Sequence, residues 1–147
     1  MIRYDVLRQK YIKDMSAIEI ECFDDPWSEE MLAGELTNPL AFYIIALDGD
    51  RVVGYAGMHE VLDEGYITNI AVTADYRRQG IGGALIEHLF DECRDNGIDY
   101  ITLEVRESNL GAQALYENKG FEKCGRRVKY YGGEEDAIIF SRYGLLS

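Results

Sequence analysis

The glycine-rich segment at residues 77–83 constrains the fold more than any other part of this sequence. It reads Arg-Arg-Gln-Gly-Ile-Gly-Gly, and it follows a β-rich run at 66–73. After it, apolar residues recur every four positions through 81–93. Strand periodicity therefore gives way to helical periodicity across the glycines. The pattern predicts a strand, a tight loop and a long amphipathic helix with a broad buried face.

Such a loop has the properties of an anion-binding site. Glycines let the backbone approach a ligand closely, and the first N–H groups of a helix lack partners inside the helix and favour negative charge. Two arginines add positive charge in a chain whose formal net charge is −12. The segment is neither a Walker loop, which needs Gly-Lys-Ser/Thr, nor a dinucleotide fingerprint, whose final glycine is missing. We interpret it as a site for a phosphate-bearing ligand, with a plain tight turn as the alternative.

The length and the net charge of the chain limit the number of domains and the kinds of partner that we expect. The 147 residues, 47% of them hydrophobic, fit one domain that we expect to span residues 1–147. The excess of 27 acidic over 15 basic residues disfavours direct binding to nucleic acid or to an anionic membrane surface, and it suits a cationic partner.

Three kinds of sequence signal are missing: a targeting or membrane-spanning segment, paired cysteines, and histidines with metal-ligand spacing. Residues 1–30 contain no basic segment followed by an apolar stretch, so we expect no signal peptide, and no membrane span is expected either. The three cysteines form no CxxC pair, which favours reduced thiols and a cytoplasmic protein. His59 and His88 are far apart and have no ligand spacing around them, so no metal site is expected.

The remaining periodicities predict an α+β order with strands predominating at the end. Ser28 is a good N-cap for a helix that Pro39 closes, and Asp48-Gly49-Asp50 is typical of a hairpin turn. We expect strands at 2–7, 41–47, 51–58, 66–73, 100–105, 121–131 and 135–143, and helices at 11–22, 28–38, 80–95 and 109–119.

Several of these segments together resemble the GNAT acyl-CoA-dependent N-acetyltransferases over residues 2–143. The residues that carry the resemblance are Asn69-Ile70-Ala71-Val72, the loop at 77–83, Leu103-Glu104-Val105, Asn109, Ala112, Leu115-Tyr116-Glu117 and Gly120-Phe121. The resemblance implies a single-domain α+β GNAT fold with a mixed, mostly antiparallel twisted sheet flanked by helices. The sheet is expected to splay between the strands that end at Val72 and Val105 and to admit acetyl-CoA there.

The resemblance also implies which residues contact acetyl-CoA. The loop at the helix start would hold the pyrophosphate through backbone N–H groups, and the strand before it would pair with the pantetheine arm and polarise the thioester carbonyl. Asn109 would contact the cosubstrate, although its position also suits a helix N-cap. The residues implied are Ile70, Ala71, Val72, Arg77, Arg78, Gln79, Gly80, Ile81, Gly82, Gly83 and Asn109.

Two further residues are implied in proton transfer. By resemblance, Glu104 is the general base for the amine, and Tyr116 is the general acid for the departing thiolate. Alternation along 100–105 places Glu104 opposite the aliphatic face of its strand, where a solvated surface residue is the alternative. A phenol with a reference pKa of ~10 suits proton donation to a thiolate, while simple packing on its helix is the alternative for Tyr116.

Within the family, the sequence is most similar to the RimI type, whose members acetylate the N-terminal alanine of the eighteenth small-subunit ribosomal protein. PWSE at 26–29, LEVRESN at 103–109, ALYE at 114–117, RRVKYY at 126–131 and EDAII at 135–139 carry this similarity. It implies a basic, ribosomal protein N-terminus as partner, and Trp27, Tyr130 and Tyr131 as substrate contacts. The oligomeric state is left open. The short Gly132-Gly133 turn and Lys129 depart from the pattern and leave the choice of substrate more open than the chemistry.

The acceptor implied by the similarity begins with Ala, followed closely by Arg or Lys. Six acidic residues in the segments expected to rim the groove would attract it, although solubility alone also explains each of them. They are Glu29, Glu30, Glu35, Glu134, Glu135 and Asp136. The alternatives are a GNAT acetyltransferase for lysine or a small amine, and a noncatalytic acyl-CoA-binding module.

Overall fold

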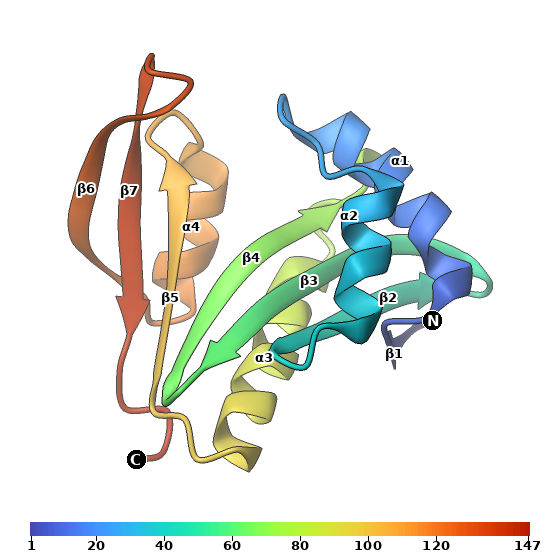
Figure 1. The fold of residues 1–147 in the computed structure, drawn as a ribbon, viewed down its shortest axis with the longest axis horizontal. Coiled ribbons are helices and arrows are strands. Elements are labelled where there is room, and N and C mark those ends of the chain that lie inside the picture. Colours follow the sequence, from blue (N-terminus) through green and yellow to red (C-terminus); the bar gives the residue numbers. More distant parts are fainter.

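The computed structural model describes residues 1–147 and contains one seven-stranded sheet with helices on both faces (Figure 1). The strand order is β1-β2-β3-β4-β5-β7-β6, and every neighbouring pair is antiparallel except β4 with β5. The expected mixed, mostly antiparallel sheet is therefore confirmed. The strands are β1 (Ile2–Val6), β2 (Ala41–Asp48), β3 (Arg51–Val61), β4 (Glu64–Val72), β5 (Tyr100–Arg106), β6 (Glu122–Tyr131) and β7 (Glu135–Arg142).

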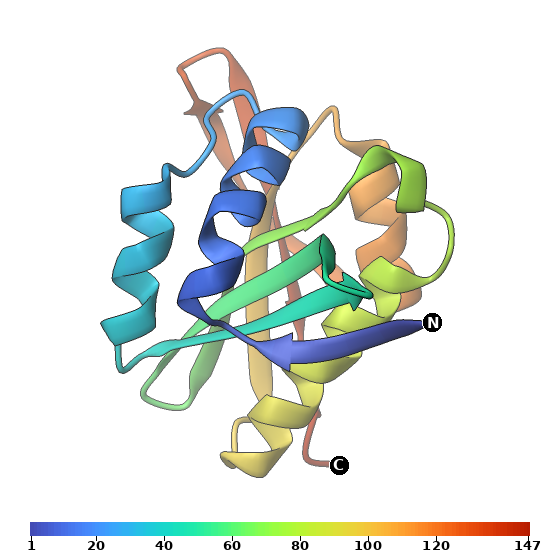
Figure 2. The ribbon, with the colours of Figure 1, turned by 90° about the vertical axis from the view of Figure 1, so that its right-hand side faces the viewer.

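Four α-helices cover the sheet, with α1 and α2 on one face and α3 and α4 on the other (Figures 1 and 2). They are α1 (Ile12–Cys22), α2 (Glu29–Gly34), α3 (Ile81–Asp95) and α4 (Leu110–Asn118), with short 3₁₀ helices at Gln9–Tyr11, Glu35–Thr37 and Ala74–Tyr76. The predicted cap at Ser28 is confirmed, because its Oγ accepts the Met31 N–H at 3.1 Å. None of the helices combines the length and the apolar character needed to cross a membrane.

Two hydrophobic clusters hold these layers together. The larger has 21 buried residues between the sheet and helices α3 and α4, and it includes the predicted stripe of α3. The smaller has 11 residues under α1 and α2, among them Tyr43 and Tyr55. Burial of this apolar surface is the main contribution to the stability of the fold.

The turn between β3 and β4 differs from the expectation. Both strands are longer than predicted, because Val61 pairs with Glu64 across a turn formed by Leu62 and Asp63. Leu62 has a φ of +57° and is 96% exposed. Leucine is uncommon in that conformation, so the residue at position 62 does not itself indicate a turn.

The two halves of the sheet separate between β4 and β5. These strands pair only where Glu64 to Tyr66 meet Tyr100 to Thr102, and they then diverge (Figure 1). In β4, Gly57 pairs with Asn69 and Met58 with Ile67, which leaves Thr68 as the extra residue of a β-bulge. Bulges bend a strand. The splayed sheet that was expected is thus present.

Candidate functional site

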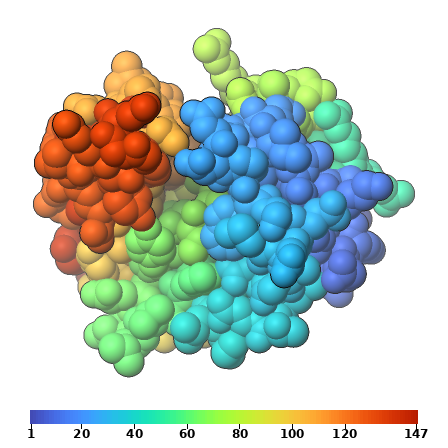
Figure 3. Space-filling view, turned by 45° about the horizontal axis from the view of Figure 1, so that its top comes forward, coloured from blue at the N-terminus to red at the C-terminus, as the bar shows by residue number.

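The divergence of β4 and β5 leaves a cleft, which we define as the space between β4 from Ile67 onward and β5 from Leu103 onward. Figure 3 shows a hollow between the β6–β7 hairpin, in dark orange, and the segment between α1 and α2, in blue. Green atoms of β4 lie at its floor. Asp25, from the α1–α2 segment, and Arg106, at the end of β5, form an ion pair of 3.6 Å that joins the two sides.

Strand β4 presents an unpaired backbone edge to the cleft. Thr73 donates its N–H to Val53 O at 2.9 Å. By alternation, the N–H groups of Ile70 and Val72 point away from β3, toward the open edge. The side chains of Ile70 and Val72 pack against the larger cluster, whereas Ala71 is buried on the face of α1.

The start of α3 has the geometry of an anion cradle. Gly80 is the N-cap with a φ of +80°, and the first helical bond runs from Ala84 N–H to Gly80 O at 3.0 Å. The N–H groups of Ile81, Gly82 and Gly83 therefore have no acceptor within the helix. Positive φ favours glycine at position 80.

Gly82 and Gly83 also serve helix packing. A Cβ added to Gly82 would lie 3.1 Å from Leu115 Cδ2, and one added to Gly83 would lie 3.0 Å from Lys119 Cε. Both contacts are with residues of α4 or its end, so these two glycines allow α3 to approach α4 closely. From the sequence, these two glycines were expected only to contact the ligand.

The two arginines of the loop have different surroundings. Arg77 donates from Nε to Val72 O at 3.0 Å and from Nη2 to Cys22 Sγ at 3.3 Å, and it lies 3.7 Å from Glu21. It ties the loop to the ends of β4 and α1. Arg78 is exposed, forms no ion pair in the structure and has a φ of +62°. Gln79 Nε2 donates to Asp75 O at 3.3 Å and stays within the loop.

Glu104 is a nearly buried carboxylate of β5. The predicted alternation is confirmed: Ile101, Leu103 and Val105 are buried in the larger cluster, and Glu104 points to the other face with a side chain only 8% exposed. Its Oε1 accepts a hydrogen bond from Arg127 Nε at 2.7 Å.

The second carboxylate oxygen, Glu104 Oε2, is the only buried side-chain polar atom of the structure without a hydrogen-bond partner. Leaving such an oxygen unpaired is costly, and buried polar groups are normally satisfied. An unpaired oxygen on a charged group therefore indicates a place where a further donor belongs.

Tyrosines surround this carboxylate. Burial, followed by the negative charge of Glu104, raises the pKa of Tyr131 to about 12 and also raises the pKa of Tyr66 above its ordinary value. Both phenols are therefore protonated at neutral pH. Tyr66 comes from β4 and Tyr131 from the end of β6, so both sides of the cleft contribute.

Tyr116 lies inside the larger cluster, 5% exposed. Its ring centroid is 5.7 Å from Phe121 in an edge-on arrangement and 6.1 Å from Phe140. Burial, with a smaller effect from Tyr131, raises the pKa of its phenol. Tyr131 thus contributes to the raised pKa of Tyr116, and Glu104 contributes to the raised pKa of Tyr131. The three side chains are therefore close to one another.

The other predicted residues divide between the two sides of the cleft. Trp27 is half-buried against the smaller cluster, and its backbone N–H donates to Glu19 Oε1 at 2.8 Å. Tyr130 is 52% exposed, with its ring 5.2 Å from that of Tyr131. Asn109 caps α4, because its side chain accepts the Ala112 N–H at 3.1 Å.

The proposed acidic rim is only partly present. Glu29, Glu30 and Glu134 are exposed and form no ion pair. Glu135 lies 3.2 Å from Arg106, and Asp136 pairs with Arg126. Glu35 was also expected at the rim of the groove. This expectation is wrong, because Glu35 is buried.

Glu35 is buried because three side chains stabilise its charge. Tyr43 Oη and Asn38 Nδ2 donate to it at 3.0 and 2.9 Å, and His59 Nε2 lies 2.5 Å away. Burial alone would raise the pKa of Glu35, but the hydrogen bonds from Asn38, His59 and Tyr43 hold it below its usual range.

Glu19 of α1 is a buried acidic residue for which the sequence predicted no role. It is 1% exposed, accepts hydrogen bonds from Tyr55 Oη and from Trp27 N–H, and lies 3.4 Å from Asn69 Nδ2. These contacts link α1 to the bulged part of β4 and to the loop before α2. A single Glu within a helix carries no sequence signal of such burial.

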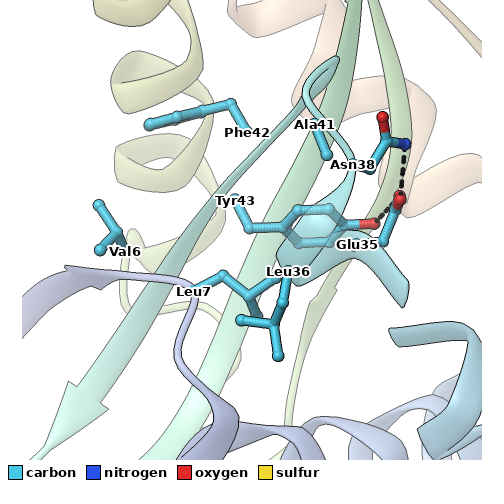
Figure 4. A pocket seen from close by; sticks show the side chains of 8 residues that line it. All are labelled: Val6, Leu7, Glu35, Leu36, Asn38, Ala41, Phe42 and Tyr43. Atoms are coloured by element: carbon cyan, nitrogen blue, oxygen red, sulfur yellow. Dashed lines mark hydrogen bonds between the residues drawn. The ribbon is translucent and has the colours of Figure 1, made fainter. Parts of the chain in front are cut away.

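A separate cavity of about 190 Å³ lies between the end of β1, the start of β2 and the 3₁₀ helix after α2 (Figure 4). It shares no residue with the cleft, and six of its eight lining residues are hydrophobic. The lining residues are Val6, Leu7, Glu35, Leu36, Asn38, Ala41, Phe42 and Tyr43.

Comparison with known proteins gives consistent matches. Residues 9–121 match the model of the acetyltransferase (GNAT) family. The [ribosomal protein bS18]-alanine N-acetyltransferase of Escherichia coli K12 is 43% identical over 119 residues, which are 79% of this chain and 80% of that protein.

Solved structures agree with the sequence matches. The crystal structure of the ribosomal-protein-S18-alanine N-acetyltransferase from Escherichia coli superposes with a TM-score of 0.89 and 37% identity, covering 97% of this chain and 94% of the other. Arabidopsis thaliana NAA60 in complex with acetyl-CoA has the same fold, with a TM-score of 0.89 at 18% identity, covering 97% and 98%.

Proposed function

Because this chain belongs to the acetyltransferase (GNAT) family, we propose that it transfers the acetyl group of acetyl-CoA to the N-terminal alanine of ribosomal protein bS18. One observation carries the assignment of chemistry: a buried carboxylate in the cleft, Glu104, keeps one oxygen without a partner. The relatives named above support the choice of acceptor.

The backbone around the cleft fits acetyl-CoA. The free N–H groups of Ile81, Gly82 and Gly83 at the start of α3 suit the pyrophosphate, and the open edge of β4 at Ile70 and Val72 suits the pantetheine arm. When bound, acetyl-CoA supplies an acetyl thioester as the acyl donor. A backbone N–H of the β4 edge then serves to polarise the carbonyl.

Of the two loop arginines, Arg78 is expected to contribute directly to cosubstrate affinity, since Arg77 is engaged with Val72 and Cys22. Arg78→Glu is expected to raise the Kd for acetyl-CoA about 10-fold, because it replaces a charge-assisted contact to phosphate by repulsion. Isothermal titration calorimetry measures this. Arg3→Glu on the edge strand β1 makes the same charge change as a control, and equal affinities of the two variants would contradict the role.

We assign the proton transfers to Glu104 and Tyr116. An α-amine with a reference pKa of ~7.7–8 is about one tenth to one sixth neutral at pH 7, whereas a lysine amine near ~10.4 is almost entirely charged. Glu104 Oε2 accepts the proton that the amine loses, directly or through water, and the Tyr116 hydroxyl gives a proton to the departing thiolate. Asn109 completes the assignment as a cosubstrate contact from the cap of α4.

The acceptor groove is assigned to the cleft entrance. Tyr130 and Tyr131 lie on the hairpin side, and Trp27 lies on the opposite side near the exposed Glu29 and Glu30. This unbalanced negative charge attracts a cationic peptide and is screened by salt. We therefore propose an acceptor with Arg or Lys soon after its N-terminal Ala.

The acceptor assignment is tested with short peptides that begin with Ala and carry Arg, Ser or Glu at the next positions. The expected order of kcat/KM is Arg, then Ser, then Glu, with the difference reduced at high ionic strength. An Nα-blocked peptide with one lysine and a set of small amines serve as competitors. Better use of those competitors would favour a lysine or small-amine acetyltransferase, and binding of acetyl-CoA without any turnover would favour a noncatalytic module.

A further inference from the structure

We propose that Arg127 is a positioning residue, which occupies Glu104 Oε1 and thereby leaves Oε2 as the oxygen that meets the substrate amine. This inference rests on the proposed function. The supporting contact is the 2.7 Å hydrogen bond from Arg127 Nε to Glu104 Oε1. No role for Arg127 follows from the sequence motifs, which include it only within the segment RRVKYY.

The two partners differ strongly in exposure. The Glu104 side chain is 8% exposed and that of Arg127 is 56% exposed. The carboxylate thus depends on Arg127 as its only donor, because the other oxygen has none. A buried charge that loses its partner is left uncompensated.

Arg127 is itself held in place. Its guanidinium lies 5.6 Å from the ring centroid of Tyr130, and Tyr130 packs edge-on against Tyr131 at 5.2 Å. The β6–β7 register becomes irregular between Arg127 and Tyr131, where Lys129 has a φ of +51° and donates its N–H to Asp136 at 2.7 Å. This local geometry places cation and aromatic rings together above Glu104.

The charged and titratable groups around Glu104 are few. Tyr66 faces it from β4, and Arg127 and Tyr131 face it from β6. On β5 the next side chain on the same face, Arg106, is engaged with Glu135 and Asp25. Arg127 is therefore the cation that contacts Glu104.

Two opposite effects follow for a cationic acceptor. Arg127 holds the Glu104 carboxylate in the orientation that leaves Oε2 for the amine, which favours turnover. Its positive charge also repels the incoming ammonium, which weakens binding. Removal of the cation should therefore lower kcat and lower KM, a combination that general damage to the site does not produce.

The test compares Arg127→Gln with Arg126→Gln in the full chain. Arg126 is the adjacent residue and carries the same charge, but it pairs with Glu107 and Asp136 rather than with Glu104. For Arg127→Gln we expect kcat to fall about 10-fold and KM for an Ala-Arg peptide to fall about 3-fold, with Arg126→Gln close to wild type. Arg127→Lys restores the cation and should recover most of the turnover.

The outcomes separate this inference from the proposed function. Equal kcat and equal KM for the two glutamine variants would overturn the role of Arg127. A lower kcat with a raised KM and no recovery in Arg127→Lys would also overturn it, because it would indicate structural damage. Full turnover by Glu104→Gln would instead refute the assigned base, whatever Arg127 does.

Discussion

Replacement of Glu104 by Gln is expected to lower kcat for acetylation of an Ala-initiated peptide by ~10²–10⁴ at pH 7, the usual size of general-base catalysis. The substitution keeps the shape of the side chain and leaves an oxygen that can accept from Arg127. It removes the basic lone pair at Oε2, which is the buried oxygen without a partner.

The loss of kcat in Glu104→Gln is also expected to depend on pH. Without the base, the reaction depends on amine that has lost its proton to solvent, and that fraction grows as pH rises toward ~8. The deficit of the variant should therefore be largest at low pH and should shrink between pH 6 and 9. Steady-state kinetics over this range provide the measurement.

Glu122→Gln is the matched control for this experiment. Glu122 lies on β6, is exposed and forms no ion pair. It should leave turnover unchanged, and circular dichroism should confirm that both variants are folded. Turnover by Glu104→Gln within about 3-fold of wild type at pH 6 would remove Glu104 from the mechanism.

Replacement of Tyr116 by Phe is expected to lower kcat by ~10² while the protein stays as stable as before. The ring contacts with Phe121 and Phe140 are retained, and no group in the structure forms a hydrogen bond with the deleted hydroxyl. Removal of a hydroxyl that forms no hydrogen bond within the protein is expected to leave the stability unchanged. Thermal unfolding and kinetics measured on the same preparation check both parts.

The protonation state of Tyr116 also limits how the rate of the wild-type enzyme can depend on pH. Burial raises its pKa above the ordinary value of 10, so the phenol holds its proton throughout the neutral range. Any alkaline fall in the rate below pH ~10 must therefore come from another group.

Tyr100→Phe is the control in which the deleted hydroxyl forms a hydrogen bond but has no role in catalysis. Its hydroxyl lies 3.0 Å from Ser141 Oγ, so deletion should lower stability slightly and leave turnover intact. If Tyr116→Phe instead lost stability and activity in proportion, the packing interpretation of Tyr116 would be correct.

Periodicity was sufficient for most of the fold. The α3 stripe, the caps at Ser28 and Asn109 and the alternation around Glu104 were all predicted, because each depends on neighbouring residues in the sequence. The turn at Leu62 was missed, since its conformation is imposed by the pairing of β3 with β4 and not by a turn-forming residue.

The site was less predictable than the fold, because a sequence shows charges without their partners. Arg77 and Arg78 are equivalent in sequence, yet only Arg77 is bound to β4 and α1. Glu35 is an ordinary helix charge by pattern, yet three side chains enclose it. The pair between Glu104 and Arg127 joins residues 23 positions apart, which no local pattern indicates.

Because β4 and β5 pair over a short length, a small rotation between the two halves of the sheet produces a large displacement at the far end of β5. Three residue pairs form the seam between its halves, and the rest of β5 extends beyond it as an arm. From Thr102 to Arg106 this arm is ~13 Å long at ~3.3 Å per residue, so a rotation of ~5° at the seam moves its end by ~1 Å. A misplacement of ~1 Å can cost ~10²-fold in rate. A substitution that rotates the two halves of the sheet about this seam would therefore misalign the β4 edge with Glu104.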